Sequence, residues 1–363
     1  MSHEAEVAFK LARVREVLQE AGAAAARLRG TDWFAWATAG GSPTVLLSAE
    51  TGVAEVLVTL DAAWVLTDEI EAGRLRDEEL PVNFEVFAHP WAEGSLRDAF
   101  VREAARGGRV LSDRPSGAEG PLPPALMAAK RRLLAPEIAR YREVGRRAAQ
   151  AMTEALEAAQ PDWTEYELAG AGAEALLACG LEPCLTLVAG ERRLPLYRHA
   201  TARGDRLGAR AMMVFCARGA GLFANLTRFV AFDTLPEADR RRHAALLDIE
   251  GAALEASRPG ALLSEVYAAL EAAYRVAGYP EAIREHHQGG STGYLAREVV
   301  AAPGTAVTLE AGTALAWNPS LRGAKLEDTM LLHEDGRLEV LTVDPRWPVV
   351  EHAGLKRPLV LER

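Results

Sequence analysis

The sequence predicts an α/β chain of two domains, and three observations support this fold class. Helix and strand signals alternate over the first third of the chain, whereas the remainder contains two helices followed by a set of strands, twice in succession. Between these parts, residues 113–124 are rich in Pro, Gly and Ser, which is typical of a linker. The length of 363 residues also fits two cores better than one. We therefore expect domains at 1–125 and 126–363.

The first domain is expected to contain helices and strands that share one core. Apolar residues at helical spacing begin near the N-terminus, and two runs rich in β-branched residues follow them. A later helix is closed by Gly107 and Gly108. The expected segments are helix 4–22, strands 54–60 and 62–67, helix 69–79, strand 84–87, helix 95–106 and strand 109–111.

The second domain is expected to consist of two similar halves. A long helix starts after Pro136, and Thr164 with Glu167 predicts a capping box for the next one. Thr234 and Glu237 repeat the capping signal where the pattern restarts. The remaining expected segments are strands 185–188, 211–215 and 220–232, a helix ending at 259, helix 264–277, and strands 306–309, 313–317 and 329–332. Two such halves would face each other across a cleft.

Composition excludes several classes of function. The chain is 49% apolar and 25% charged, as soluble globular proteins are, and it has neither an apolar run of spanning length nor a charged leader. We expect a cytoplasmic protein without membrane partners. Three cysteines are too few for a disulfide framework, so we expect them to be reduced. The net charge of −10 argues against nucleic acid as a partner.

Four stretches, in order, resemble motifs of the creatinase, prolidase and aminopeptidase P family. Residues 130–143 are similar to the first helix of the family's catalytic domain, and 221–228 to its Gly-Tyr-x-Ser-Asp-x-Thr-Arg strand. Residues 286–298 resemble its histidine loop, and 312–319 with 326–329 its closing strands. The resemblance implies a creatinase-like α/β domain, followed by a pita-bread domain of two pseudo-symmetric halves. It also implies a homodimer.

The family resemblance further implies a pair of divalent ions (Mn, Co or Zn) held by two Asp, one His and two Glu. A bridging water would then cleave an N-terminal peptide bond, often next to proline. In this sequence the five positions carry Val214, Asn225, His286, Asn318 and Glu327. Only one carboxylate remains, and valine has no lone pair. Two adjacent divalent ions repel each other and prefer anionic oxygens, so we expect no metal pair and no cofactor. A single weakly held ion stays open.

His286 and Glu327 are the candidate catalytic residues. His286 and His287 are adjacent, and on an extended segment their side chains would point to opposite sides. One of them is then either a base facing the cleft or a hydrogen-bonded structural residue. Without metals, Glu327 needs a cationic or hydrogen-bonding partner, and Arg228 and His286 are the candidates.

Further residues are expected to line the cleft. The family's accessory histidines fall at Leu196 and Gly293, and His199 is close enough in sequence to refill the first position. Cys216 is expected to be a small buried hydrophobe rather than a nucleophile. The residues expected at the ligand cleft are Asn225, Asn318, Val214, His199, Tyr197, Arg228, His287, Tyr294 and Arg297.

Three functions are compatible with these residues. The first is a descendant of the proline peptidases that binds a small peptide or amide, either as a binding protein or as a metal-independent hydrolase of a C–N bond. The second is an active Xaa-Pro dipeptidase or aminopeptidase with an unusual metal site, against which Val214 argues. The third is a regulatory or structural pseudoenzyme.

Overall fold

A computed structural model describes residues 1–363, and these form two compact units of mixed α/β structure. The first unit contains Met1–Ala139 with Ala220–Leu222, and the second contains Arg140–Gly219 with Phe223–Arg363. The division falls inside a helix, α6, whereas the boundary predicted from sequence lies at residue 125. The first turn of α6 belongs to the first unit because Glu137 forms an ion pair with Lys10, at 2.8 Å.

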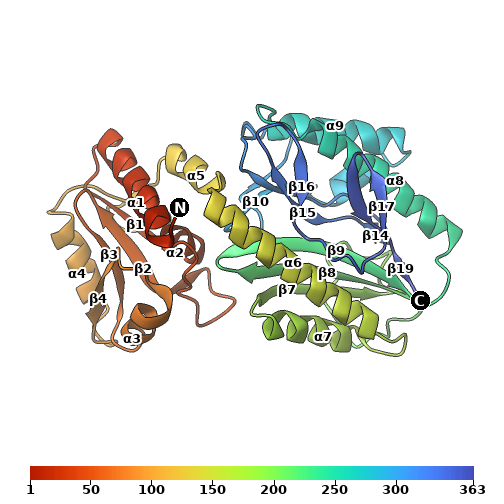
Figure 1. The fold of residues 1–363 in the computed structure, drawn as a ribbon, viewed down its shortest axis with the longest axis horizontal. Coiled ribbons are helices and arrows are strands. Elements are labelled where there is room, and N and C mark those ends of the chain that lie inside the picture. Colours follow the sequence, from red (N-terminus) through yellow and green to blue (C-terminus); the bar gives the residue numbers. More distant parts are fainter. The chain divides into compact units, whose positions relative to one another are not determined.

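The first unit is built on a six-stranded sheet in the order β4-β3-β2-β1-β5-β6 (Figure 1). Helix α4 covers one face, where its Val101 and the C-cap residue Ala105 pack against Ala25 and Leu57. The strands are β1 (Ala25–Gly30), β2 (Thr51–Thr59), β3 (Ala63–Asp68), β4 (Glu85–His89), β5 (Val110–Ser112) and β6 (Gly120–Pro121). The helices are α1 (His3–Glu20), α2 (Thr31–Ala37), α3 (Ala72–Arg74), α4 (Ser95–Ala104) and α5 (Pro124–Arg131).

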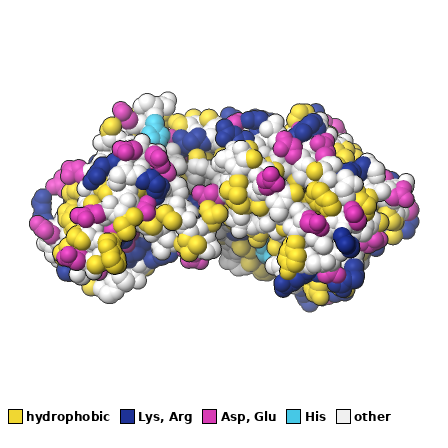
Figure 2. Space-filling view, turned by 90° about the horizontal axis from the view of Figure 1, so that it is seen from below, with side chains coloured by type: hydrophobic (Ala, Val, Ile, Leu, Met, Phe, Trp, Pro, Cys, Tyr) yellow, Lys and Arg dark blue, Asp and Glu magenta, His cyan; other side chains and the backbone are white.

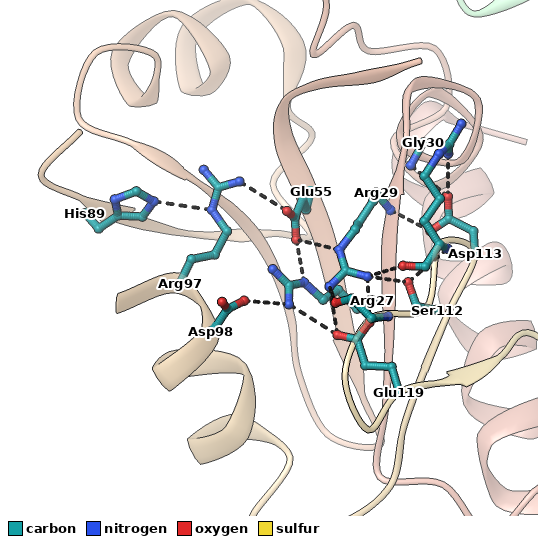
Figure 3. A network of polar contacts seen from close by, with 12 residues as sticks. Arg27, Arg29, Gly30, Glu55, His89, Arg97, Asp98, Ser112, Asp113 and Glu119 are labelled. Atoms are coloured by element: carbon teal, nitrogen blue, oxygen red, sulfur yellow. Dashed lines mark hydrogen bonds and ion pairs between the residues drawn. The ribbon is translucent and has the colours of Figure 1, made fainter. Parts of the chain in front are cut away.

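A charged network crosses the same sheet face (Figure 3). Arg27 lies 2.6 Å from Glu55 and 2.8 Å from Asp98, and Arg29 lies 2.6 Å from Glu119. Each guanidinium in this network therefore has a carboxylate partner, which indicates a structural role.

Parts of this unit differ from the sequence prediction. β1 and α2 were not predicted, and the expected linker at 113–124 contains β6, which pairs in parallel with β5. The expected helix 69–79 begins only at Ala72. Helix α3 covers three residues, and a π-helical turn continues it over Leu75–Glu79.

The second unit has the predicted repeated order. Helices α6 (Ala135–Ala158) and α7 (Glu165–Ala178) precede the sheet β19-β9-β8-β7, and α8 (Glu237–Ala256) and α9 (Leu263–Val276) precede the sheet β11-β10-β12-β15-β16. Each helix pair has its own apolar core with its sheet. In Figure 1, α6 and α7 lie along the first sheet and α8 and α9 along the second. The strands of the first sheet are β7 (Glu182–Gly190), β8 (Arg210–Gly219), β9 (Leu222–Ala231) and β19 (Leu361–Glu362).

The strands of the second sheet are β10 (Gly289–Thr292), β11 (Val299–Val300), β12 (Ala314–Trp317), β15 (Asp328–Leu332) and β16 (Leu338–Val340). Two hairpins complete the unit, β13 (Ser320–Leu321) with β14 (Ala324–Lys325), and β17 (Val349–His352) with β18 (Leu355–Pro358). The expected strand 306–309 is absent, since only an isolated bridge from Leu262 to Thr308 forms there.

The two predicted capping boxes have different outcomes. Thr164 accepts a hydrogen bond from the Glu167 N–H, and the Glu167 side chain accepts one from the Thr164 N–H, as predicted. The prediction at Thr234 is wrong, because α8 begins at Glu237 after Pro236 and has no side-chain cap. Pro236 occupies the N-cap position, so Thr234 lies two residues too early for its hydroxyl to cap the first turn.

The helices and the surface agree with the composition. None of the helices combines the length and the apolar character needed to cross a lipid bilayer. Acidic and basic side chains are interspersed on the visible face in Figure 2.

Candidate ligand-binding site

Asn225 connects the two sheets of the second unit. Its N–H donates to Oγ1 of Thr329 at 2.7 Å, and its side-chain amide donates to Oγ1 of Thr292 at 2.9 Å. The three residues come from β9, β15 and β10, and all three are buried. The Asn225 Oδ1 atom has no hydrogen-bond partner. An acceptor oxygen therefore remains available at the junction of the sheets.

Glu327 lies beside this junction and is held by two cations. Its carboxylate lies 2.6 Å from Nη2 of Arg297 and 2.8 Å from Nζ of Lys325, and it accepts a hydrogen bond from the Thr227 hydroxyl at 2.8 Å. Burial alone would raise the pKa of Glu327, but Lys325 and Arg297 outweigh burial and keep that pKa below its usual range. Glu327 is therefore ionised and doubly paired.

The partners expected for Glu327 were Arg228 and His286, and neither of their side chains contacts its carboxylate. Arg228 instead forms an ion pair with Asp328 at 2.7 Å and donates to the carbonyl of Thr342. Successive strand residues point to opposite faces, so Thr227 meets Glu327 while Arg228 meets Asp328 on the other side. Arg228 thus lies outside the expected cleft lining.

Three histidines lie together in the second unit. His286 Nε2 is 2.9 Å from His199 Nε2, and the rings of His286 and His287 stack with centroids 4.5 Å apart. The expectation that His286 and His287 point to opposite sides is wrong. The rings stack although the backbone at His286, directly after the 3₁₀ turn at Ala282–Glu285, is extended with φ −159° and ψ 147°.

The histidines are neutral at pH 7. Burial, with a further contribution from Lys325, lowers the pKa of His286 to about 2. Burial and then Arg297 lower the pKa of His287 to about 4, and burial also lowers the pKa of His199. Since a neutral imidazole has one N–H, the short contact of His199 and His286 requires one ring to donate and the other to accept.

The remaining predicted residues have varied surroundings. Val214 packs in an apolar cluster with Leu187, Met212 and Phe229. Asn318 is buried, donates its N–H to the Gln288 carbonyl at 3.1 Å, and leaves Oδ1 without a partner.

Tyr197 and Tyr294 differ in exposure. Tyr197 is half exposed beside the Arg193 guanidinium, whereas Tyr294 is buried. For Cys216, burial raises the pKa of the thiol to about 12, which opposes the formation of a nucleophilic thiolate.

Two features of the site were not predicted. Lys325 ends β14 two residues before Glu327, a spacing that places both on one side of an extended segment, and this signal was in the sequence. A cavity of about 320 Å³ also lies in the second unit, lined by Leu194, Pro195, Arg210, Phe229 and His243 among others. Its lining comes from segments far apart in the sequence, between Glu191 and Val360, so no local pattern marks it.

The paired helix-helix-sheet halves and their central junction define a pita-bread fold of the prolidase class. The chain belongs to metallopeptidase family M24, which matches residues 139–334. No curated protein shows significant sequence similarity to it.

Solved structures share the fold over nearly the whole chain. An Xaa-Pro dipeptidase from Bacillus anthracis has a TM-score of 0.78 at 18% identity, covering 98% of this chain and 100% of the other. The prolidase from Pyrococcus horikoshii has 0.77 at 18% identity, covering 93% and 99%. The N-terminal domain of the FACT complex subunit SPT16 from Cicer arietinum has 0.70 at 14% identity, covering 93% and 96%.

Proposed function

We propose that this member of family M24 binds a small peptide- or amide-like ligand and does not operate as a dinuclear metallopeptidase. The observation that supports the proposal is the pairing of Glu327. Two cationic nitrogens already lie within 2.8 Å of its oxygens, on Lys325 and Arg297. A divalent ion at this carboxylate would have to displace them or lie next to like charges, which low local dielectric makes costly.

The other donors do not fit a metal pair. Val214 supplies no lone pair and packs among apolar side chains. Asn225 and Asn318 supply neutral amide oxygens, which lack the charge with which carboxylates bridge two ions. One carboxylate with two adjacent cations therefore replaces the four carboxylates that the family resemblance implies.

The chemistry of the ligand follows from the unpartnered atoms. The Oδ1 atoms of Asn225 and Asn318 are buried acceptors without partners. An unsatisfied buried polar atom costs about 1–3 kcal/mol, so a ligand that donates an N–H group to either atom would recover that free energy. Amides, amino groups and guanidino groups have such donors.

A second activity, metal-independent hydrolysis of a C–N bond, is favoured by the contact of His199 and His286. Their Nε2 atoms are 2.9 Å apart, so the exposed His199 would be the base, and His286, whose pKa is lowered to about 2, would hold it in position. Turnover of small amides that persists in EDTA and is lost in His286→Gln would support this activity. Turnover that is equal in His286→Gln would exclude it.

The decisive experiment combines metal analysis, turnover and ligand binding. Untagged protein should hold no pair of Mn²⁺ or Co²⁺ ions per chain and should not hydrolyse Xaa-Pro dipeptides when these ions are added. A thermal-shift screen of dipeptides, amides and guanidino compounds should yield a stabilising ligand. Asn225→Ala and Asn318→Ala should each reduce that shift, whereas Asn83→Ala in the first unit should leave it unchanged. Two bound Mn²⁺ per chain with chelator-sensitive turnover would overturn the proposal.

We also propose a homodimer and a cytoplasmic location. The family resemblance supports the first and the composition supports the second. Light scattering coupled to size exclusion measures the mass of the assembly and would contradict the first proposal if it gave the 39.1 kDa of one chain.

A further inference from the structure

His199, His286 and His287 bring their ring nitrogens together, which side chains that only fill a core do not need to do. His199 is in the loop after β7, while His286 and His287 precede β10, and one nitrogen of each lies within 4.8 Å of the others. The Nδ1 atoms of His286 and His287 are buried and have no hydrogen-bond partner. Three nitrogen donors from two separate segments thus converge, and two buried ring nitrogens without hydrogen-bond partners accompany them.

We propose that His199, His286 and His287 form a mononuclear site for a late first-row transition ion such as Zn²⁺. Zinc binds neutral imidazole at about 2.0–2.1 Å, and three protein ligands are the usual set where a fourth position stays open. Nitrogens around a tetrahedral ion are then about 3.4 Å apart, a value that follows from this bond length. The spacing within the cluster brackets that separation, and the exposed His199 can adjust.

This site differs from the metal pair that the fold class implies. It shares only His286 with the five positions discussed above, and it contains no carboxylate. Imidazole donors favour Zn²⁺, Cu²⁺, Ni²⁺ and Co²⁺ over Mg²⁺ and Mn²⁺, which prefer oxygen. The inference therefore predicts a selectivity that a carboxylate-bridged pair would not show.

The surrounding charges determine the fourth ligand. Lys325 and Arg297 lie near the histidines, and Glu327 offsets only one of these two positive charges. Such surroundings weaken the binding of a cation but favour an anion next to it. The open position should therefore take hydroxide or a ligand carboxylate. The inference rests on the proposed function in one respect, since it requires Glu327 to remain paired with Lys325 and Arg297 and not to bind a metal ion.

The test is a metal titration of untagged protein after dialysis against EDTA. Calorimetry should give one equivalent of bound Zn²⁺ and no binding of Mn²⁺, and Co²⁺ should produce the visible absorption of a tetrahedral nitrogen site. His199→Ala and His287→Ala should each weaken Zn²⁺ binding at least tenfold. His352→Ala is the matched control, because His352 pairs with Asp248 at 3.5 Å outside the cluster, and it should bind as the unaltered protein does.

The outcomes separate the two proposals. Failure of Zn²⁺ to bind, or equal Zn²⁺ binding in the His199→Ala and His287→Ala proteins, would overturn the three-histidine site and leave the proposed function standing. Binding of two Mn²⁺ would overturn the proposed function. The melting temperature of each metal-free variant shows whether it is folded, and the exposed His199 keeps the test valid if His287→Ala does not fold.

Discussion

The electrostatics of the site depend on one residue, Glu327, through its carboxylate. It is buried, ionised and in contact with Lys325 and Arg297. Breaking a buried pair leaves an uncompensated charge, and such changes usually cost more than the pair itself contributes. The same pairing that keeps cations away from Glu327 should therefore be visible as stability.

Glu327→Gln is expected to destabilise the protein by about 3–5 kcal/mol, because it leaves the buried cations of Lys325 and Arg297 without their shared carboxylate. Urea unfolding would measure this loss. Lys356→Met is the control, because Lys356 is exposed on β18, and its effect should stay within about 0.5 kcal/mol. Equal stabilities of the two variants would mean that the pair is not formed in solution.

His243 predicts how stability changes with pH. Burial lowers its pKa from the ordinary 6.5 to about 4. The unfolded chain takes up a proton here as the pH falls through 6.5, whereas the folded chain does so only near 4. The stability that His243 contributes to the folded protein is therefore fully present above pH 6.5 and is lost as the pH falls from 6.5 to 4.

The expected result is a shallower fall of the melting temperature over that interval in His243→Gln than in the unaltered protein. His352→Gln should retain the original slope, since it leaves His243 in place. Parallel slopes in all three proteins would exclude a contribution from His243.

At the scale of elements, the two predicted helix caps provide a matched pair. Thr164 caps α7 through its hydroxyl, while Thr234 precedes an uncapped α8. Thr164→Ala should cost about 1 kcal/mol, as the loss of a side-chain cap usually does. Thr234→Ala should cost less than about 0.5 kcal/mol, the usual range for surface changes. Chemical denaturation would measure both, and similar losses would contradict the assigned caps.

The elements missed by sequence analysis have a common physical cause. β1 is buried along nearly its whole length and contains no β-branched or aromatic residue, and α2 is buried at every position. Periodicity detects half-buried elements and fails for these. Pro121 concealed β6 for a different reason, because proline is tolerated only at the edge of a sheet, which is where β6 lies.

At the scale of the whole molecule, the altered ligand positions can be reversed together. The triple variant Val214→Asp, Asn225→Asp, Asn318→Glu would restore four carboxylates. Without metal it should be less stable than the unaltered protein, because the Val214→Asp change would place a carboxylate in an apolar cluster and the carboxylates would repel one another.

Added Mn²⁺ should then raise the melting temperature of the triple variant. Binding to the folded state alone contributes about 2.7 kcal/mol at a metal concentration 100 times Kd. The unaltered protein should not respond to Mn²⁺, and an equal response of both proteins would show that the substituted positions do not control metal binding. Differential scanning fluorimetry measures both responses.

The sequence by itself determined the repeated order of helices and strands in the second unit, the family resemblance and the residue types at its five key positions. These features depend on local periodicity and on the spacing of short motifs. Only the tertiary structure decided which side chains meet. His199 contacts His286 across 87 residues of sequence, and Glu327 pairs with Arg297 rather than Arg228. Such contacts follow from loop paths and from the face on which each strand residue lies, and no local pattern specifies both.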